Sequence, residues 1–229
     1  MENNKKEHIY VIWKDPESRK RFKIGNLIRN NKYIFEYDLK ETYQAMKYGF
    51  EPFVAFPDIN EVYSHNDLFL TFLCRLPDRR RADINEILKN YGMDKFDAFE
   101  LLLRSGGRLP TDTLEFIKPI FIEESNIIRY FFVAGTRHYD ICDKNTCKKN
   151  IKLNIGDKLL LEREPDNDFD KNAVIIFSED KTILGYVPNY YCKPVSKAIM
   201  KNRNIECVVR NINQTANCQE CIKVKLTIE

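Results

Sequence analysis

The chain lacks a long hydrophobic run. No stretch of its 229 residues approaches the roughly 20 apolar residues that a membrane-spanning helix needs. Residues 1–20 contain no apolar run of signal-peptide length either. These absences exclude a membrane span, and we expect a cytoplasmic protein with no membrane partner.

Histidine is scarce, and the motifs of common enzyme classes are absent. His8, His65 and His138 are the three histidines, and they lie far apart in the sequence. The chain has no P-loop, no H-E-x-x-H zinc motif and no nucleophile motif. We therefore expect a protein that is not an enzyme and that holds no cofactor.

Neither charge sign dominates. The chain has 37 Lys and Arg against 34 Asp and Glu, which gives a formal net charge of +3. Up to residue 120 the counts are 20 against 19, and beyond it 17 against 15, so neither half is a polybasic nucleic-acid clamp. Five of those 15 acids fall within residues 162–170, which leaves the rest of the second half basic. With 43% hydrophobic and 31% charged residues, the composition is that of a soluble globular protein.

The seven cysteines are an odd number in a chain without an export signal, which favours reduced thiols over disulfides. Two pairs are close in sequence, Cys142 with Cys147 and Cys218 with Cys221. The second pair has the C-x-x-C spacing of a zinc half-site, so four thiolates could meet around one zinc ion if the two pairs lay side by side. Ordinary thiols in two polar loops are the alternative.

The first half predicts strands followed by helices. Residues 9–13 are a short apolar run, and residues 22–38 alternate apolar and polar residues around Asn30 and Asn31, which indicates a β-hairpin. From residue 67 the apolar residues take a helical period, and Asp97 and Gly106 are typical of a helix start and stop. The segments with this period are 67–76, 81–92 and 97–107. The first domain is therefore expected to be α+β, a β-hairpin plus helices.

The second half predicts a small β domain. Six short strand-like segments lie within about a hundred residues, with one amphipathic helix at residues 193–202. The strand-like segments are 128–135, 157–164, 172–177, 183–187, 205–212 and 222–229. This pattern is typical of a partly open β-barrel or a sandwich.

Three aspartates alternate in the segment PDNDFD, at positions 166, 168 and 170. A calcium-binding EF-hand loop that began at Asp166 would need glycine at its sixth position and glutamate at its twelfth, where this chain has Lys171 and Phe177. The calcium interpretation is therefore excluded. The residue types are also those that close turns through their own side chains, so a purely structural turn is an alternative.

The segments FFVAGTRHY, IGDKLLLEREPDNDFDKNAV and ILGYVP together resemble the HIRAN domain over residues 128–229. The central block matches the family pattern in order, from the R-E-P of residues 163–165 to Asn172 and Ala173. The resemblance implies an all-β, OB-like, partly open barrel with one or two short helices. It also implies binding of single-stranded DNA, in the best-understood members through the 3′-hydroxyl end.

The matching positions suit such a site chemically. Aromatic rings stack on any base, and the candidates are Phe169 and the pair His138 and Tyr139. A carboxylate repels phosphate but accepts a hydrogen bond from a sugar hydroxyl, so Asp170 is the candidate for the 3′-OH contact. Arg137 suits a charge-assisted contact to a phosphate.

Three further positions are implied by the resemblance alone. Tyr186 and Asn189 fall where the family has polar groups on the phosphate side, and Asn167 falls beside the base-stacking position. The chain departs from the family pattern at Asp168, where proline is frequent, and at Asn189, where a basic residue can stand. A metal-dependent nuclease whose metal is held by Asp168 and Asp170 with Glu164 is a further alternative.

The first half resembles the N-terminal subdomain of HipA-type toxin kinases, over residues 9–117. The resemblance rests on IGNLIRNNKYIFEYD, LFLTFLCRLPDRRRADINEILKNYGM and DAFELLLRSGGRLPTDTLEF. The sequence carries no glycine-rich ATP loop and no kinase catalytic loop, so kinase activity does not transfer. The resemblance implies a docking module for a HipA-type kinase core, with a plain scaffold domain as the alternative.

Together these patterns predict two domains, 1–117 and 129–229, joined by a linker at 118–128. The expected function is recognition of single-stranded DNA or DNA 3′ ends by the second domain, with protein docking by the first. The alternative is an antitoxin-like regulator of a HipA-type kinase that has no role on DNA. Toxin–antitoxin control, defence and DNA repair all fit these expectations.

Overall fold

The computed structural model describes residues 7–139, 152–214 and 220–229. The chain divides into two compact units, Met1–Pro119 and Ile120–Glu229.

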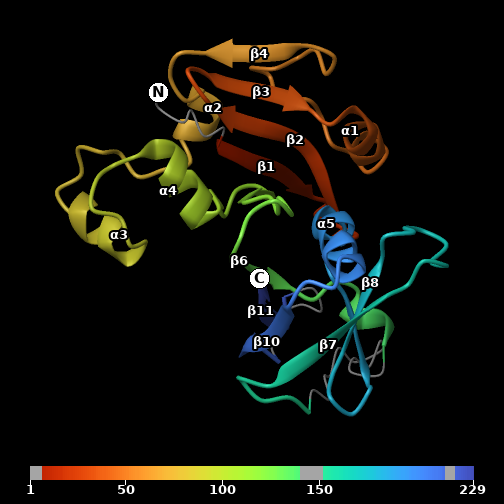
Figure 1. Cartoon of the computed structure of the whole chain (residues 1–229). Coiled ribbons are helices and arrows are strands. Elements are labelled where there is room, and N and C mark those ends of the chain that lie inside the picture. Colours follow the sequence, from red (N-terminus) through yellow and green to blue (C-terminus); the bar gives the residue numbers. More distant parts are fainter. Residues whose placement is uncertain (1–6, 140–151, 215–219) are drawn as a thin grey trace. The chain divides into compact units, whose positions relative to one another are not determined.

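The first unit contains a five-stranded antiparallel sheet in the order β4-β3-β2-β1-β5 (Figure 1). Its strands are β1 (Glu7–Lys14), β2 (Arg21–Arg29), β3 (Tyr33–Tyr37), β4 (Val62–His65) and β5 (Leu114–Ile117). Its helices are α1 (Leu39–Met46), α2 (Leu70–Leu73), α3 (Ile84–Asn90) and α4 (Ala98–Ser105). The unit is α+β, as the sequence predicts.

The predicted hairpin and the predicted cap of α4 are both present. Strands β2 and β3 pair up to Arg29 and Tyr33, and the side chain of Asn30 closes the turn by accepting from the Lys32 N–H at 2.9 Å. The Asp97 carboxylate accepts from an N–H in the first turn of α4 at 3.0 Å, because helix N-termini leave such donors unpaired. Gly106 ends α4 in the left-handed conformation.

The helical prediction for residues 67–76 is largely wrong. Only the four residues of α2 are helical, since Phe69 has an extended backbone (φ −53°, ψ 135°). Its ring and that of Phe72 both pack on Phe56, with centroids 5.0 and 5.6 Å away, so core packing of aromatic rings sets the apolar spacing of this segment. Helix α1 and strand β4 were not predicted, because β4 is almost wholly exposed and α1 buries only Thr42 and Ala45.

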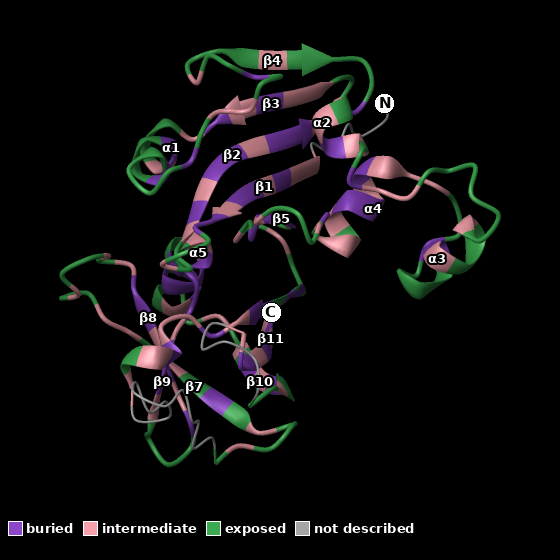
Figure 2. Ribbon diagram, turned by 180° about the vertical axis from the view of Figure 1, so that it is seen from behind, coloured by how far each residue is buried: buried purple, intermediate pink, exposed green. Residues whose placement is uncertain are grey.

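The core of the first unit is rich in phenylalanine. The rings of Phe35, Phe56 and Phe72 lie 4.6 to 5.6 Å apart, and Phe72 also meets Phe116 on β5 at 5.4 Å. Such tilted and edge-on ring pairs add to the free energy gained by burial. The residues of β1 and β2 are either buried or intermediate, whereas those of β4 are mostly exposed (Figure 2).

The second unit contains a six-stranded antiparallel sheet in the order β6-β11-β10-β7-β8-β9. Its strands are β6 (Ile127–Phe132), β7 (Lys158–Arg163), β8 (Val174–Phe177), β9 (Ile183–Tyr186), β10 (Ile205–Ile212) and β11 (Ile222–Ile228). A 3-10 turn, η1 (Thr136–His138), follows β6, and α5 (Asn189–Met200) follows β9. All six strand-like segments are thus strands, and the single helix begins four residues earlier than predicted.

The two edges of this sheet meet, which makes it a curled, partly open barrel. Ala134, just after β6, exchanges two backbone hydrogen bonds of 2.9 and 2.8 Å with Tyr186 at the end of β9. The approach depends on Gly185, because a Cβ atom there would lie 2.3 Å from the carbonyl oxygen of Ala134. Within the three ranges that the structure describes, no helix is long and apolar enough to cross a membrane.

Candidate nucleic-acid site

The acidic turn joins β7 to β8 and is closed by its own side chains. The side-chain oxygen of Asn167 accepts from the backbone N–H groups of Phe169 and Asp170, both at 3.0 Å. Oδ1 of Asp170 accepts from the N–H of Asn172 at 2.8 Å. The structural interpretation of the PDNDFD pattern is therefore correct for Asn167 and for one oxygen of Asp170.

The same turn leaves two groups available for a ligand. The ring of Phe169 is 97% exposed, although burial of a phenylalanine ring is strongly favourable. Asp170 is half-buried, and within residues 7–139, 152–214 and 220–229 its second oxygen, Oδ2, makes no hydrogen bond. The turn thus presents an aromatic face and a carboxylate acceptor at adjacent positions.

Glu164 connects the turn to the neighbouring strand. Its Oε2 accepts from the Tyr186 hydroxyl at 2.9 Å and from the side-chain amide of Asn167 at 2.5 Å. From the sequence, Glu164 was a member of the family pattern and a possible metal ligand of the nuclease alternative, and its role as a hydrogen-bond acceptor for Tyr186 and Asn167 was missed. The spacing of Glu164 and Asn167 around Pro165 could have indicated their mutual hydrogen bond. The contact of Glu164 with Tyr186 had no such local signal, because it spans 22 residues.

Tyr186 also lies beside Tyr139, with ring centroids 6.1 Å apart. Burial raises the pKa of the Tyr186 hydroxyl, and the neighbouring Tyr139 and Glu164 raise that pKa further. The hydroxyl therefore keeps its proton over the physiological range and donates to Glu164. This chain of contacts fixes the orientation of the Tyr186 ring.

The β-bridge between Ala134 and Tyr186 brings the segment after β6 beside the end of β9. Gly135 has φ 74° and starts η1, which carries Arg137 and His138. The two side chains contact each other, because Nε of Arg137 donates to Nε2 of His138 at 3.0 Å. In the described part of the chain Arg137 forms no ion pair.

The first turn of α5 lies near the acidic turn. Burial raises the pKa of the Cys192 thiol to about 12, and the Asp170 carboxylate contributes to that rise. Asn189 is the first residue of α5 and is exposed. The ring contact of Tyr139 with Tyr186 and the hydrogen bond of Tyr186 with Glu164 therefore link these residues to the acidic turn. Arg137 and His138 lie in η1, which ends just before Tyr139. For Asn189, the structure gives only its position at the start of α5.

The predicted zinc site falls mainly outside the described residues. Cys142, Cys147 and Cys218 belong to the segments 140–151 and 215–219, which the structure does not describe. Cys221 is buried, and its thiol donates to Oγ1 of Thr136 at 3.6 Å. In the rest of the chain, which the structure does describe, no group of three or more His, Cys, Asp or Glu side chains is placed to hold a metal ion.

A search of curated proteins gave no significant match. Among solved structures, the HIRAN domain of human HLTF is similar over 45% of this chain and 74% of that chain, with 17% identity and a TM-score of 0.35. A protein from Lactobacillus plantarum is similar over 45% of this chain and 93% of its own, with 21% identity and a TM-score of 0.37.

The family models give the assignment. The model described as HIRAN domain matches residues 128–229, and the model described as HipA N-terminal domain matches residues 19–111. The first range contains the barrel, η1 and the acidic turn, and the second contains β2, β3, β4 and all four helices of the first unit. This chain therefore joins a HipA N-terminal domain to a HIRAN domain.

Proposed function

We propose that the second unit binds single-stranded DNA by its 3′-hydroxyl end, at the acidic turn. The HIRAN family is one of single-stranded DNA and DNA-end recognition, which supports the class of ligand. The observation that carries the finer proposal is the pairing of an almost fully exposed Phe169 ring with the half-buried carboxylate of Asp170.

The two groups suit different parts of a terminal nucleotide. A base stacks on the exposed ring of Phe169, a contact that every base can make. Oδ2 of Asp170 accepts a hydrogen bond from the 3′-hydroxyl, while its negative charge disfavours an internal phosphate at the same position. Arg137 supplies the cation for the last internucleotide phosphate. An acidic group inside a DNA site is therefore a means of selecting a free end.

The proposal is tested by fluorescence anisotropy with labelled oligonucleotides that end in 3′-OH or in 3′-phosphate. The wild type is expected to prefer the 3′-OH end. Asp170→Asn keeps an oxygen for the Asn172 N–H but removes the charge, so the preference should fall by about tenfold or more. Equal binding of both ends by the wild type, or no binding at low salt, would overturn the proposal.

Asp168 provides the matched control. It is exposed, lies two residues before Asp170 and makes no hydrogen bond within the described residues. Asp168→Ala should leave the end preference intact, because this carboxylate has no place in the proposed contact. A loss equal to that of Asp170→Asn would mean that general charge, not a hydroxyl contact, governs binding.

We propose further that the chain binds DNA without cleaving it. A nuclease centre needs acids that converge on a metal ion, whereas one oxygen of Asp170 closes the turn and Glu164 accepts from Tyr186 and Asn167. The same oligonucleotides, incubated with the protein in Mg²⁺ or Mn²⁺, should stay intact. Cleavage that is lost in Asp170→Asn would contradict this expectation.

For the first unit we propose docking to a HipA-type kinase core. Strand β4 is one of the two edge strands of the sheet, and an edge strand presents backbone groups that can pair with another chain. Val62 on β4 and Leu70 at the start of α2 are large apolar side chains exposed in the same unit. These features favour a protein partner over a plain scaffold.

Binding of a purified HipA-type kinase core to the full chain tests the docking proposal. Val62→Lys and Leu70→Lys should weaken binding, since each places a charge where an apolar contact is expected. Val54→Lys is the control, because Val54 is equally apolar and exposed but lies outside β4 and α2. If the core binds and no oligonucleotide does, the antitoxin-like alternative replaces the DNA function.

A further inference from the structure

A second surface of the barrel combines aromatic rings with cations. Along β11 the buried residues alternate with Lys223, Lys225 and Thr227, which point away from the core. The neighbouring strand β6 alternates in the same way and exposes Tyr130. Because successive side chains in a strand point to opposite faces, these residues share the outer face of the sheet. None of them belongs to the acidic turn.

The strand register sets rings beside lysines. Phe132 on β6 is opposite Lys223 on β11, and Tyr130 is opposite Lys225. Nζ of Lys223 lies 5.8 Å from the centroid of the Phe132 ring, a distance typical of a cation–π contact. Tyr130 is 55% exposed and is therefore open to a ligand. On the other side of β11, Asn211 of β10 is opposite Lys223.

The charge of this face is positive. Arg210, Lys223 and Lys225 form no ion pair in the part of the chain that the structure describes. The acids here are Glu220, at the edge, and Glu206, which pairs with Lys158 at 3.5 Å. Within the described residues, three cations thus stand without an ion-pair partner on two adjacent strands, β10 and β11, which favours an anionic ligand.

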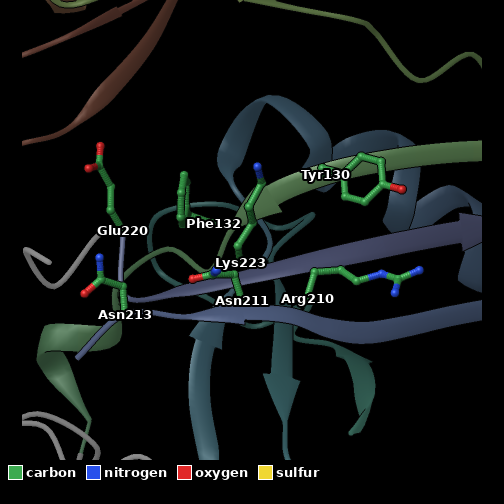
Figure 3. A pocket seen from close by; sticks show the side chains of 7 residues that line it. All are labelled: Tyr130, Phe132, Arg210, Asn211, Asn213, Glu220 and Lys223. Carbon is green, nitrogen blue, oxygen red and sulfur yellow. The ribbon is translucent and has the colours of Figure 1, made fainter. Parts of the chain in front are cut away.

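The same face is hollowed. Figure 3 shows the side chains around an open depression of about 610 Å³, with the Tyr130 and Phe132 rings and the Lys223 amine standing over strands that also carry Arg210. The lining residues are Tyr130, Phe132, Arg210, Asn211, Asn213, Glu220 and Lys223. Rings, amides and cations in one depression are groups that contact bases and phosphates.

We propose that this outer face of β6, β11 and β10 binds an internal stretch of single-stranded DNA, independently of any 3′ end. Cations alone would suit a duplex, and rings alone would suit an apolar protein surface. The cross-strand alternation of both favours a single strand, whose exposed bases stack on Tyr130 while its phosphates meet Lys223, Lys225 and Arg210.

The test uses the full chain and a labelled circular single-stranded DNA, which has no end for the acidic turn to bind. The wild type is expected to bind the circle. The double variant Lys223→Ala, Lys225→Ala should bind it about tenfold or more weakly, and the slope of log affinity against log salt should fall by about 1.4 if two phosphate contacts are lost. Tyr130→Ala should weaken binding about fivefold or more.

Two controls separate this contact from general charge. Lys197→Ala, Lys201→Ala removes the same charge from exposed positions on and beside α5 of the same unit, and should leave binding of the circle unchanged. Lys223→Arg, Lys225→Arg keeps the charge and should restore binding. Amide exchange of Val224 and Leu226 verifies that each variant retains the sheet.

The outcomes distinguish this surface from the proposed end-binding site. Binding of linear 3′-OH oligonucleotides without binding of the circle would overturn the present inference and leave end recognition standing. Binding of the circle without any preference for a 3′-OH end would overturn the proposed end recognition and leave the present inference standing. The inference also fails if duplex DNA binds as tightly as the circle and Tyr130→Ala has no effect, or if the α5 control weakens binding equally.

Discussion

The Tyr186 hydroxyl donates to Oε2 of Glu164 at 2.9 Å and thereby ties β9, an edge strand of the second sheet, to the turn between β7 and β8. The same oxygen accepts from the side chain of Asn167, whose own oxygen holds the backbone of Phe169 and Asp170. The Glu164 carboxylate therefore positions the exposed Phe169 ring and the Asp170 carboxylate through hydrogen bonds that pass by way of Asn167. We regard Glu164 as the residue that positions the site.

Removal of the Glu164 carboxylate should destabilise this part of the barrel. Glu164→Ala leaves two partly buried donors without their acceptor, which costs about 1 to 3 kcal/mol. Tyr186→Phe should cost less, about 1 kcal/mol, and almost nothing in the Glu164→Ala background. The free energy of opening, measured by amide exchange at Ala134 and Tyr186, checks this. Additive effects of the two substitutions would contradict the coupling.

Closure of the barrel should depend on the absence of a side chain at Gly185. Gly185 has φ 141°, and an added Cβ would lie 2.3 Å from the Ala134 oxygen and 2.9 Å from Cγ1 of Val133. Gly185→Ala should therefore destabilise the unit by about 2 kcal/mol or more.

Gly156→Ala is the control for backbone strain. Gly156 also has positive φ, at 100°, but an added Cβ would have no neighbour within 4 Å. Gly156→Ala should therefore lower the free energy of unfolding only by the backbone strain, about 1 kcal/mol. Amide exchange at Tyr186 compares the two variants, and equal losses would show that the contact with Ala134 is not the cause.

The strands of the second unit and the acidic turn could be predicted from the sequence because their signals are local. Alternating apolar residues mark β10 and β11, and Asn167 and Asp170 close the turn with N–H groups two or three residues away. The family pattern then supplied the ligand class.

The contacts between distant segments could not be predicted. The row of Tyr130 and Lys225 depends on the pairing of β6 with β11, which joins residues almost a hundred positions apart. The contact of Glu164 with Tyr186 likewise depends on how β9 lies beside β8. Helix α2 was overestimated because a run of apolar residues has a helical period whether a helix or a ring cluster forms.

The first unit should lose stability in acid through Asp112. Its carboxylate accepts from both terminal nitrogens of Arg75, at 2.5 and 2.6 Å, and the Arg75 side chain is only 4% exposed. Burial alone would raise the pKa of Asp112, but the hydrogen bonds from Arg75 and Leu114, with the charge of Arg75, outweigh it and lower that pKa.

The sign of the pH dependence follows from the lowered pKa. The pair contributes fully to stability above the unfolded pKa of about 3.9 and loses its contribution as the pH falls through the lower pKa of the folded state. The difference in unfolding free energy between wild type and Asp112→Asn should therefore be large at pH 7 and shrink below about pH 4. Urea unfolding followed by the fluorescence of Trp13, the single tryptophan, reports this unit. If the unfolding free energies of the two proteins changed in parallel with pH, Asp112 would not be the source of the acid sensitivity.

Phe169 should contribute to binding and not to folding. Its ring is 97% exposed, so Phe169→Ala removes almost no buried area and should change the free energy of unfolding by no more than about 0.5 kcal/mol. The same substitution should weaken binding of a 3′-OH oligonucleotide by about 1 to 3 kcal/mol, the value of one stacked base. Phe169→Tyr, which keeps the ring, should bind as the wild type does. Ile155→Ala removes another exposed apolar side chain of the same unit and should change neither quantity. A large loss of stability in Phe169→Ala would mean that the ring packs on its own chain, and unchanged affinity would mean that no base stacks there.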